Sequence, residues 1–409
     1  MTILRSGPMK TIDRLVSFRG RWPGTTAERD AARYLAGELE ALGRDVQVEP
    51  IRVRPAYHLT HALHAALAVV GSVVSVYVAP LGVVILLLVA VSMYLDLTGR
   101  FYLLRLLMPR QRSQNVTSPG SRPDAAARLV LTAHYDAARS GLMFARWSRP
   151  PGRIRKALSK LGGPIDAVFW TVTVVLLLTV GRLFIDRDVT LFTAAQFVPT
   201  VLLIVAVILL VDVALSEVVP GASDNASGVA ATLELVRRLS EAPPDEHLDV
   251  WVVFTGAKEG LMLGMREWMR AHAGDLDTRW TFFVNIDNVG RGNVRYVIGE
   301  GFVVISQPDA RMVELCHSVG NAEPYIWRLG TDGTIPIMGG YSSITICCTD
   351  EHDRIPDFHR HTDTPDRIEP EAVERAVRFA EKLVRRIDAE LVPSIFPTLS
   401  GEERRGVRR

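Results

Sequence analysis

The stretch Leu129-Val-Leu-Thr-Ala-His-Tyr-Asp136 joins an apolar run to a histidine and an aspartate. Its apolar beginning predicts a buried strand. Because residues i and i+2 of a strand share a face, His134 and Asp136 point the same way. A carboxylate beside a histidine can fix the tautomer and orientation of an imidazole that binds a metal. Alone, the His134–Asp136 pair is more typical of an ordinary polar contact. A metal site would need further acidic or histidine residues at the ends of other strands.

The composition excludes some classes of protein. The chain has 409 residues, of which 48% are hydrophobic, a formal net charge of +2 and a mean hydropathy of +0.16. This charge gives no general attraction to nucleic acid, so we expect no nucleic-acid partner. The three cysteines indicate neither a disulfide framework nor a cysteine zinc site. The first 20 residues lack the apolar core of a signal peptide.

The hydrophobic residues are concentrated in blocks. The first block, Ala62–Tyr94, contains no Asp, Glu, Lys or Arg. As a single helix it would be roughly 50 Å long, which exceeds the ~30 Å hydrocarbon core of a bilayer. Pro80-Leu-Gly82 interrupts it, so we expect a helical hairpin with helices at about 59–79 and 82–101. One long tilted helix is the alternative.

A second pair of apolar blocks, Ala167–Ile185 and Val189–Val211, flanks the polar turn Asp186-Arg-Asp188. Each block suits a span of ~20 residues. Lys and Arg are abundant beside the soluble segments and sparse in the far turns, so the positive-inside rule predicts a cytoplasmic soluble part and cytoplasmic termini. We therefore expect an integral protein of the cell membrane. The basic run Arg146–Lys160 either binds anionic lipid headgroups or only sets this topology.

Three histidines, His58, His61 and His64, recur at helical spacing where the first span begins. A metal site on one helix face is one interpretation. We favour the other, polar residues at the membrane interface.

Outside the apolar blocks, strands and helices alternate. Predicted strands are Asp45–Val53, Leu129–Leu131, Leu248–Thr255, Trp280–Ile286, Val294–Ile298 and Ser342–Cys348. Predicted helices are one capped by Thr25 or Thr26 and ending at Leu42, and 226–240, 262–273, 309–319 and 370–391. This alternation predicts an α/β fold with a central mixed β-sheet flanked by helices.

Acidic and histidine residues stand at the ends of several predicted strands, where sites form in open α/β sheets. Besides His134 and Asp136, they are Asp224 in a Gly-rich turn before a helix, Glu259, Asp287, and His359 and His361 in the loop before the last helix. Two histidines and three carboxylates suit two zinc ions that share one carboxylate. Each residue alone has an ordinary structural interpretation, such as a helix cap, but that interpretation does not explain the set.

The set resembles the di-zinc aminopeptidase family, which includes aminopeptidase Y, glutamate carboxypeptidase and the non-catalytic transferrin receptor ectodomain. The motifs that carry this resemblance are Thr132–Asp136, Pro220–Gly228, Val252–Gly264, Phe282–Gly290 and Phe358–Asp366. The resemblance covers approximately 25–56, 113–140 and 217–391. It implies a zinc-aminopeptidase-like fold, two Zn²⁺ ions, and a peptide or a protein N-terminus as substrate.

The resemblance also implies roles for individual residues. His134 is similar to a ligand of one zinc ion, and Asp136 to the carboxylate that orients it. Asp224 is similar to the ligand that bridges both ions. Glu259 is similar to a ligand of the other ion, and Asp287 to the residue that completes the first.

Three further expectations follow from the resemblance. His359 matches the last ligand because three residues separate it from Asp363-Thr364, and His361 is the rival. The Asp224–Asn225 peptide bond is expected to be cis, as in the family. Asp332 lies in the loop that lines the family's substrate pocket, which makes it a candidate substrate-binding residue.

One position departs from the family. Where the family has a glutamate as general base, next to the ligand Glu259, this chain has Lys258. A protonated lysine cannot accept a proton, so three interpretations stand: a pseudo-enzyme, a neutral lysine acting as base, or another residue in that role.

These observations predict a membrane-bound zinc metallopeptidase, slow or altered because of Lys258. The alternative is a catalytically inactive membrane receptor or scaffold. The predicted organisation is a peptidase-like domain formed by 1–58, 102–164 and 216–393, transmembrane hairpins at 59–101 and 165–215, and a disordered tail at 394–409.

Overall fold

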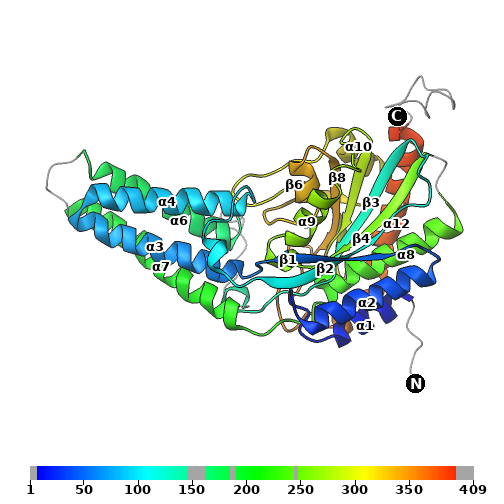
Figure 1. The fold of residues 1–409 in the computed structure, drawn as a ribbon, viewed down its shortest axis with the longest axis horizontal. Helices are drawn as coiled ribbons and strands as arrows, with labels where there is room; N and C mark the ends of the chain where they lie inside the picture. Colours follow the sequence, from blue (N-terminus) through cyan, green and yellow to red (C-terminus); the bar gives the residue numbers. More distant parts are fainter. Residues whose placement is uncertain (1–6, 146–161, 185–189, 244–246, 393–409) are drawn as a thin grey trace.

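The computed structural model describes residues 7–145, 162–184, 190–243 and 247–392. A bundle of long helices extends from one side of an α/β part (Figure 1). The predictions for the basic run Arg146–Lys160, the turn Asp186–Asp188 and the tail 394–409 concern residues outside these ranges.

An eight-stranded mixed sheet forms the centre of the α/β part, in the order β1-β2-β4-β3-β5-β8-β6-β7. The strands are β1 (Gln47–Val53), β2 (Gln111–Ser118), β3 (Ala127–His134), β4 (Leu248–Thr255), β5 (Thr281–Ile286), β6 (Asn293–Glu300), β7 (Glu323–Trp327) and β8 (Ser342–Thr349). The central strands β4, β3, β5 and β8 run parallel, whereas β1 pairs with β2, β2 with β4 and β6 with β8 in antiparallel fashion. The predicted α/β fold class is confirmed.

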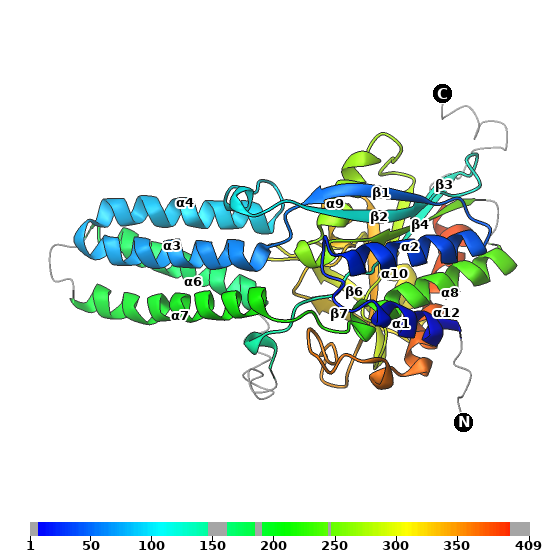
Figure 2. The same cartoon turned by 60° about the horizontal axis from the view of Figure 1, so that its bottom comes forward.

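Both faces of the sheet are covered (Figure 2). In β3, Leu129 and Leu131 belong to one buried cluster and Val130 to another, as the two-residue period of a strand requires. The first cluster holds α1 (Gly7–Ser17), α2 (Thr26–Ala41), α8 (Gly228–Glu241), α10 (Ala310–Val319) and α12 (Pro370–Arg386). The second holds α9 (Leu263–Ala271) and α11 (Thr334–Met338).

Among the residues that the structure describes, four helices are long and apolar enough to cross a membrane. They are α3 (Tyr57–Tyr77), α4 (Ala79–Leu97), α6 (Pro164–Gly181) and α7 (Thr190–Leu215). The first apolar block is therefore two helices, but it breaks at Val78 and not at Pro80-Leu-Gly82. Pro80 fits into the first turn of α4, where a helix needs no backbone donor. Gly82 allows α4 to approach α3, because a Cβ there would lie 2.6 Å from the Ser75 Cα.

The helix bundle shares a core with the sheet. The second buried cluster runs from Val130 and Phe283 of the sheet to Ala65 of α3, Val89 of α4 and Val172 of α6. The bundle is thus packed against the α/β part through apolar side chains, which fixes the beginnings of α3 and α6 beside the sheet.

Candidate metal centre

Three neighbouring parallel strands bring a histidine and two acidic residues to one edge of the sheet. β3 ends at His134, β4 ends four residues before Glu259, and β5 ends directly before Asp287. Because β4, β3 and β5 are parallel neighbours, their carboxyl ends lie together. The structure thereby brings together side chains that are up to 153 residues apart in the sequence.

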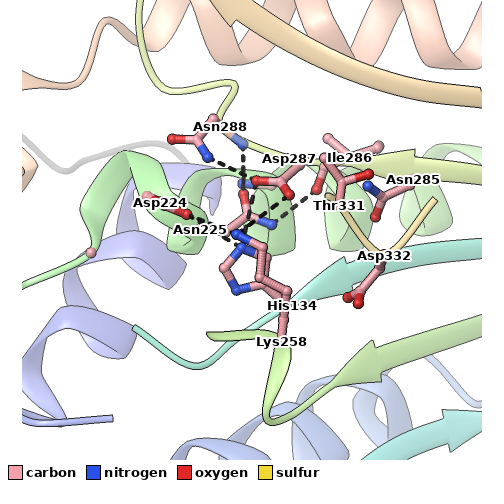
Figure 3. Close-up of polar contacts among 12 residues, drawn as sticks. His134, Asp224, Asn225, Lys258, Asn285, Ile286, Asp287, Asn288, Thr331 and Asp332 are labelled. Atoms are coloured by element: carbon pink, nitrogen blue, oxygen red, sulfur yellow. Dashed lines mark hydrogen bonds and ion pairs between the residues drawn. The ribbon is translucent and has the colours of Figure 1, made fainter. Parts of the chain in front are cut away.

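The predicted ligands form two groups of three that share Asp224. In the first group, the His134 Nε2 lies 3.3 Å from the Asp224 Oδ1 and 3.5 Å from the Asp287 Oδ1 (Figure 3). In the second group, the His359 Nε2 lies 3.4 Å from the Asp224 Oδ2 and 3.6 Å from the Glu259 Oε2. The two oxygens of one carboxylate therefore face two different histidines.

These spacings fit zinc. Tetrahedral bonds of about 2.0–2.1 Å place neighbouring ligand atoms about 3.3–3.4 Å apart. Within the described part of the chain, the His134 Nε2, the His359 Nε2 and both Asp224 oxygens are buried and have no hydrogen-bond partner. Buried polar atoms without a partner are costly, and one cation in each ligand group would satisfy all four.

Asp136 connects the His134 imidazole to the Glu259 loop. Its Oδ1 lies 3.3 Å from the His134 Nδ1, which leaves the Nε2 facing the carboxylates. Its two oxygens also accept hydrogen bonds from the backbone amides of Lys258 (3.2 Å) and Glu259 (2.8 Å). Asp136 can therefore orient the His134 side chain directly and Glu259 through the Glu259 backbone amide.

The turn that carries Asp224 is held by Asp363. The Asp363 carboxylate accepts the backbone amides of Ser223 (2.7 Å) and Asp224 (3.0 Å). Burial raises the pKa of Asp363 to about 7. The Asp224–Asn225 peptide bond is cis, as the resemblance predicts.

The loop that carries Lys258 and Glu259 has an irregular backbone, because Ala257, Leu261 and Met262 all have positive φ. Two distant buried side chains hold it. Glu28 of α2 accepts the Ala257 amide at 3.2 Å, and Arg105 donates to the Gly260 carbonyl at 2.7 Å.

Sequence reasoning missed Asp363, Glu28 and Arg105 as supporting residues. Only Asp363 had a local signal, its position after His359 in the family motif. Glu28 and Arg105 lie 229 and 155 residues from their partners, without a motif that relates them.

Lys258 reaches into the centre. Its Nζ lies 3.0 Å from the Glu259 Oε1, 3.7 Å from the Asp224 Oδ1 and 3.8 Å from the Asp287 Oδ2. Burial lowers the pKa of the Lys258 ammonium, but the carboxylates of Asp287 and Glu259 outweigh burial and hold the pKa above its ordinary value. In this arrangement the Lys258 amine donates a hydrogen bond to the Glu259 Oε1.

The two histidines of the last motif are placed differently. His359 is buried and faces Asp224 and Glu259, whereas the His361 side chain is exposed. Phe358 stacks on the His359 ring at a centroid distance of 3.9 Å, and Phe144 meets it edge-on at 4.6 Å. Of the two candidates, the structure brings His359 to the centre.

Asp332 lies deeper than a residue of a substrate pocket would. Its carboxylate is buried and accepts a hydrogen bond from Thr255, at the end of β4. Burial raises the pKa of Asp332 to about 7. Asp332 is not among the residues that line the cavity described below, and its role in substrate binding stays a prediction.

A cavity of about 390 Å³ opens beside the second ligand group, bounded by Lys258, Glu259 and His359. Its other walls are mainly apolar and include Phe144, Phe302, Trp327, Leu329, Ile355 and Phe358. The first residues of two bundle helices also line the cavity, namely Tyr57 and His58 of α3 and Pro164 and Ile165 of α6.

The three histidines of α3 are buried within the protein, and their location at a membrane interface stays a prediction. His64 hydrogen-bonds to Ser92 of α4 at 2.9 Å, and the His61 Nε2 lies 3.5 Å from Asp96. The position of the bundle against the sheet explains this, because the beginning of α3 is enclosed by protein. Within the described residues, the groups able to hold a metal contain none of these histidines.

Comparisons with known proteins agree with this geometry. Residues 210–384, which carry four of the five predicted ligands, match the model of peptidase family M28. A Zn-dependent exopeptidase from Parabacteroides distasonis is 15% identical, with a TM-score of 0.52 over 94% of this chain and 97% of that chain. No curated protein sequence matches the chain significantly.

Other solved structures share the fold. The LapA aminopeptidase of Legionella pneumophila is 11% identical, with a TM-score of 0.52 over 94% of this chain and 72% of that chain. A glutaminyl cyclase of Bacteroides thetaiotaomicron, bound to N-acetylhistamine, is 17% identical, with a TM-score of 0.52 over 93% and 96%. At these identities, the similarity shows the fold alone. The reaction has to be inferred from the side chains of this chain.

Proposed function

We propose that this chain, whose residues 210–384 match the model of peptidase family M28 and whose fold is similar to that of a Zn-dependent exopeptidase, is a membrane-bound zinc metallopeptidase with an aminopeptidase-like activity. The single observation that supports this most is the pair of ligand groups joined through Asp224. Two zinc ions would be held by these groups, with the carboxylate of Asp224 contributing to both. Zinc, when bound, supplies Lewis acidity towards the scissile carbonyl and activates water for attack.

The chain's own residues prepare the centre for this chemistry. Asp136 holds His134 and the amides of Lys258 and Glu259, so ligands from two strand ends keep one arrangement. The cavity accepts an apolar residue of the substrate and keeps water away from the reacting bond. Lys258 is a hydrogen-bond donor where a base is needed, so we expect slow or altered hydrolysis.

The substrate is a peptide or a protein N-terminus at the membrane surface. The cavity supports this, since the beginnings of α3 and α6 form part of its wall and both helices can span a bilayer. We place the α/β part and both termini in the cytoplasm because of the distribution of Lys and Arg.

Lys258 also favours a second candidate, a non-catalytic membrane receptor or scaffold that keeps the fold for binding. A protein that no longer catalyses hydrolysis needs no general base, so an ammonium at that position agrees with a loss of catalysis. The two candidates differ in whether hydrolysis accompanies zinc binding.

The test uses the full chain in detergent micelles with a panel of aminoacyl fluorogenic amides and an N-terminal glutamine peptide. Zinc-dependent hydrolysis that Asp224→Asn abolishes supports the peptidase. A large gain in Lys258→Glu means that the centre is intact and restrained by the lysine. Full activity that Lys258→Ala removes would instead make the amine the base. Zinc binding without hydrolysis in any variant would support the receptor.

A further inference from the structure

We infer that the Lys258 ammonium takes the place of one of the two zinc ions, so that the centre holds a single tightly bound zinc between Asp224, Glu259 and His359. This inference rests on the proposed function, because it assumes that the centre binds zinc. It changes the number of ions and assigns the one that remains.

The contacts of Lys258 are those of a bound cation. Its side chain is only 7% exposed, and its Nζ lies 3.0–3.8 Å from one oxygen of each acidic ligand, Glu259, Asp224 and Asp287. These three carboxylates are all the acidic members of the two ligand groups. The ammonium therefore stands between both groups and neutralises charge in each.

The charge of the centre supports one ion. The carboxylates of Asp224, Glu259 and Asp287 carry a formal charge of −3, which one ammonium (+1) and one zinc ion (+2) balance. Adding a second dication beside a buried ammonium would leave positive charge that no side chain of these groups compensates, which is costly away from water.

The geometry also indicates which ion remains. In the first group, the Asp224 Oδ1 and the Asp287 Oδ2 face Lys258, and the Asp287 Oδ1 accepts a hydrogen bond of 2.8 Å from Asn288. The oxygens of this group already face donors or the ammonium.

In the second group, the oxygens facing His359 are the Asp224 Oδ2 and the Glu259 Oε2. Lys258 contacts the opposite oxygen of each carboxylate, the Oδ1 and the Oε1. The group around His359 thus keeps its metal-facing atoms, and the cavity opens beside this group.

The test counts zinc in the full-length protein in micelles, by elemental analysis after dialysis against zinc and by calorimetric titration with zinc. We compare Lys258→Met, which removes the charge, Lys258→Glu, which reverses it, and Lys382→Met, an exposed control on α12. We expect one zinc per chain in the unmodified protein and the control. Lys258→Glu should bind two, and Lys258→Met should bind the second ion at least about 100-fold more tightly than the unmodified protein does.

Histidine variants locate the ion. His134→Ala should retain the single zinc and His359→Ala should lose it, while the thermal unfolding midpoint shows that each variant is folded. The reverse pattern would overturn the assignment to the His359 group. Two tightly bound ions in the unmodified protein, or one ion in Lys258→Glu, would overturn the inference and leave the proposed function standing. No zinc in any variant would overturn both.

Discussion

The Arg105 Nη1 donates a hydrogen bond of 2.7 Å to the carbonyl oxygen of Gly260, the residue that follows Glu259. The same guanidinium pairs with Asp96, at the end of α4, through contacts of 2.5 and 3.0 Å. Both side chains are buried. The helical hairpin of α3 and α4 is therefore connected to the Glu259 loop through the Asp96–Arg105 ion pair.

Replacing Arg105 by alanine should destabilise the protein by about 3–5 kcal/mol, because it leaves the Asp96 carboxylate buried without its cation. Arg105→Lys should cost less stability, since it keeps the charge but loses the planar pair of donors. Thermal unfolding in micelles measures both. Arg110→Ala, an exposed arginine in the same segment, is the control. A loss in Arg105→Ala no larger than in this control would contradict the prediction.

Asp136→Asn should weaken zinc binding by about 10–100-fold, as removal of a carboxylate behind a ligating histidine typically does. The asparagine side chain is uncharged and has one acceptor oxygen. It cannot accept the hydrogen bonds from the backbone N–H groups of Lys258 and Glu259 and also balance the charge of the His134 imidazole. Competition with a chromophoric chelator measures the affinity. Asp30→Asn, on the surface of α2, should leave it unchanged. Equal zinc affinities in the two variants would show that Asp136 has no orienting role.

Glu28 should make the stability of the protein depend on pH. Burial, and then the charge of Asp136, raises the pKa of Glu28 from 4.5 to about 8. Between these values the folded state binds more protons than the unfolded state, so its stability falls as the pH rises from 4.5 to about 8.

In Glu28→Gln this fall should be smaller, because glutamine does not ionise. The measurement is the thermal midpoint against pH in the presence of a chelator, with Glu40→Gln on the exposed side of α2 as the control. A pH profile of Glu28→Gln identical to that of the unmodified protein would refute the assignment.

Phe144 should set the preference for large apolar substrate residues. It is half-buried, lines the cavity and meets the His359 ring edge-on. Phe144→Ala should raise the KM for substrates with leucine or phenylalanine by about tenfold, the effect of about 1.4 kcal/mol of lost apolar contact, with little change for alanine. Leu142→Ala, an exposed residue of the same turn, is the matched control. An equal rise in KM for all three substrates would mean that Phe144 supports the loop and does not select the substrate.

The sequence allowed prediction of the fold class and of the residues that meet at the sheet edge. Apolar runs predict central parallel strands well, and Asp287 and Glu259 follow such runs directly or within a few residues. Their meeting at one edge follows from the parallel order of β4, β3 and β5. Zinc binding by these residues stays a prediction.

Other features could not be predicted, for physical reasons. β2 reads Gln111-Arg-Ser-Gln-Asn and is a strand because β1 and β4 flank it, not because of hydrophobic alternation. β7 is a short edge strand that contains Pro324. The burial of His58, His61 and His64 depends on how the bundle packs against the sheet, which no local pattern encodes.

The shared cavity wall also affects how this protein can be handled. Because Tyr57, His58, Pro164 and Ile165 belong to the bundle, excising the hairpins to obtain a water-soluble protein would remove one side of the cavity. Because most of the remaining lining is apolar, an alkyl detergent monomer would fit the same cavity and compete with substrate. Apparent inhibition should therefore increase with the concentration of free detergent and be relieved in lipid nanodiscs.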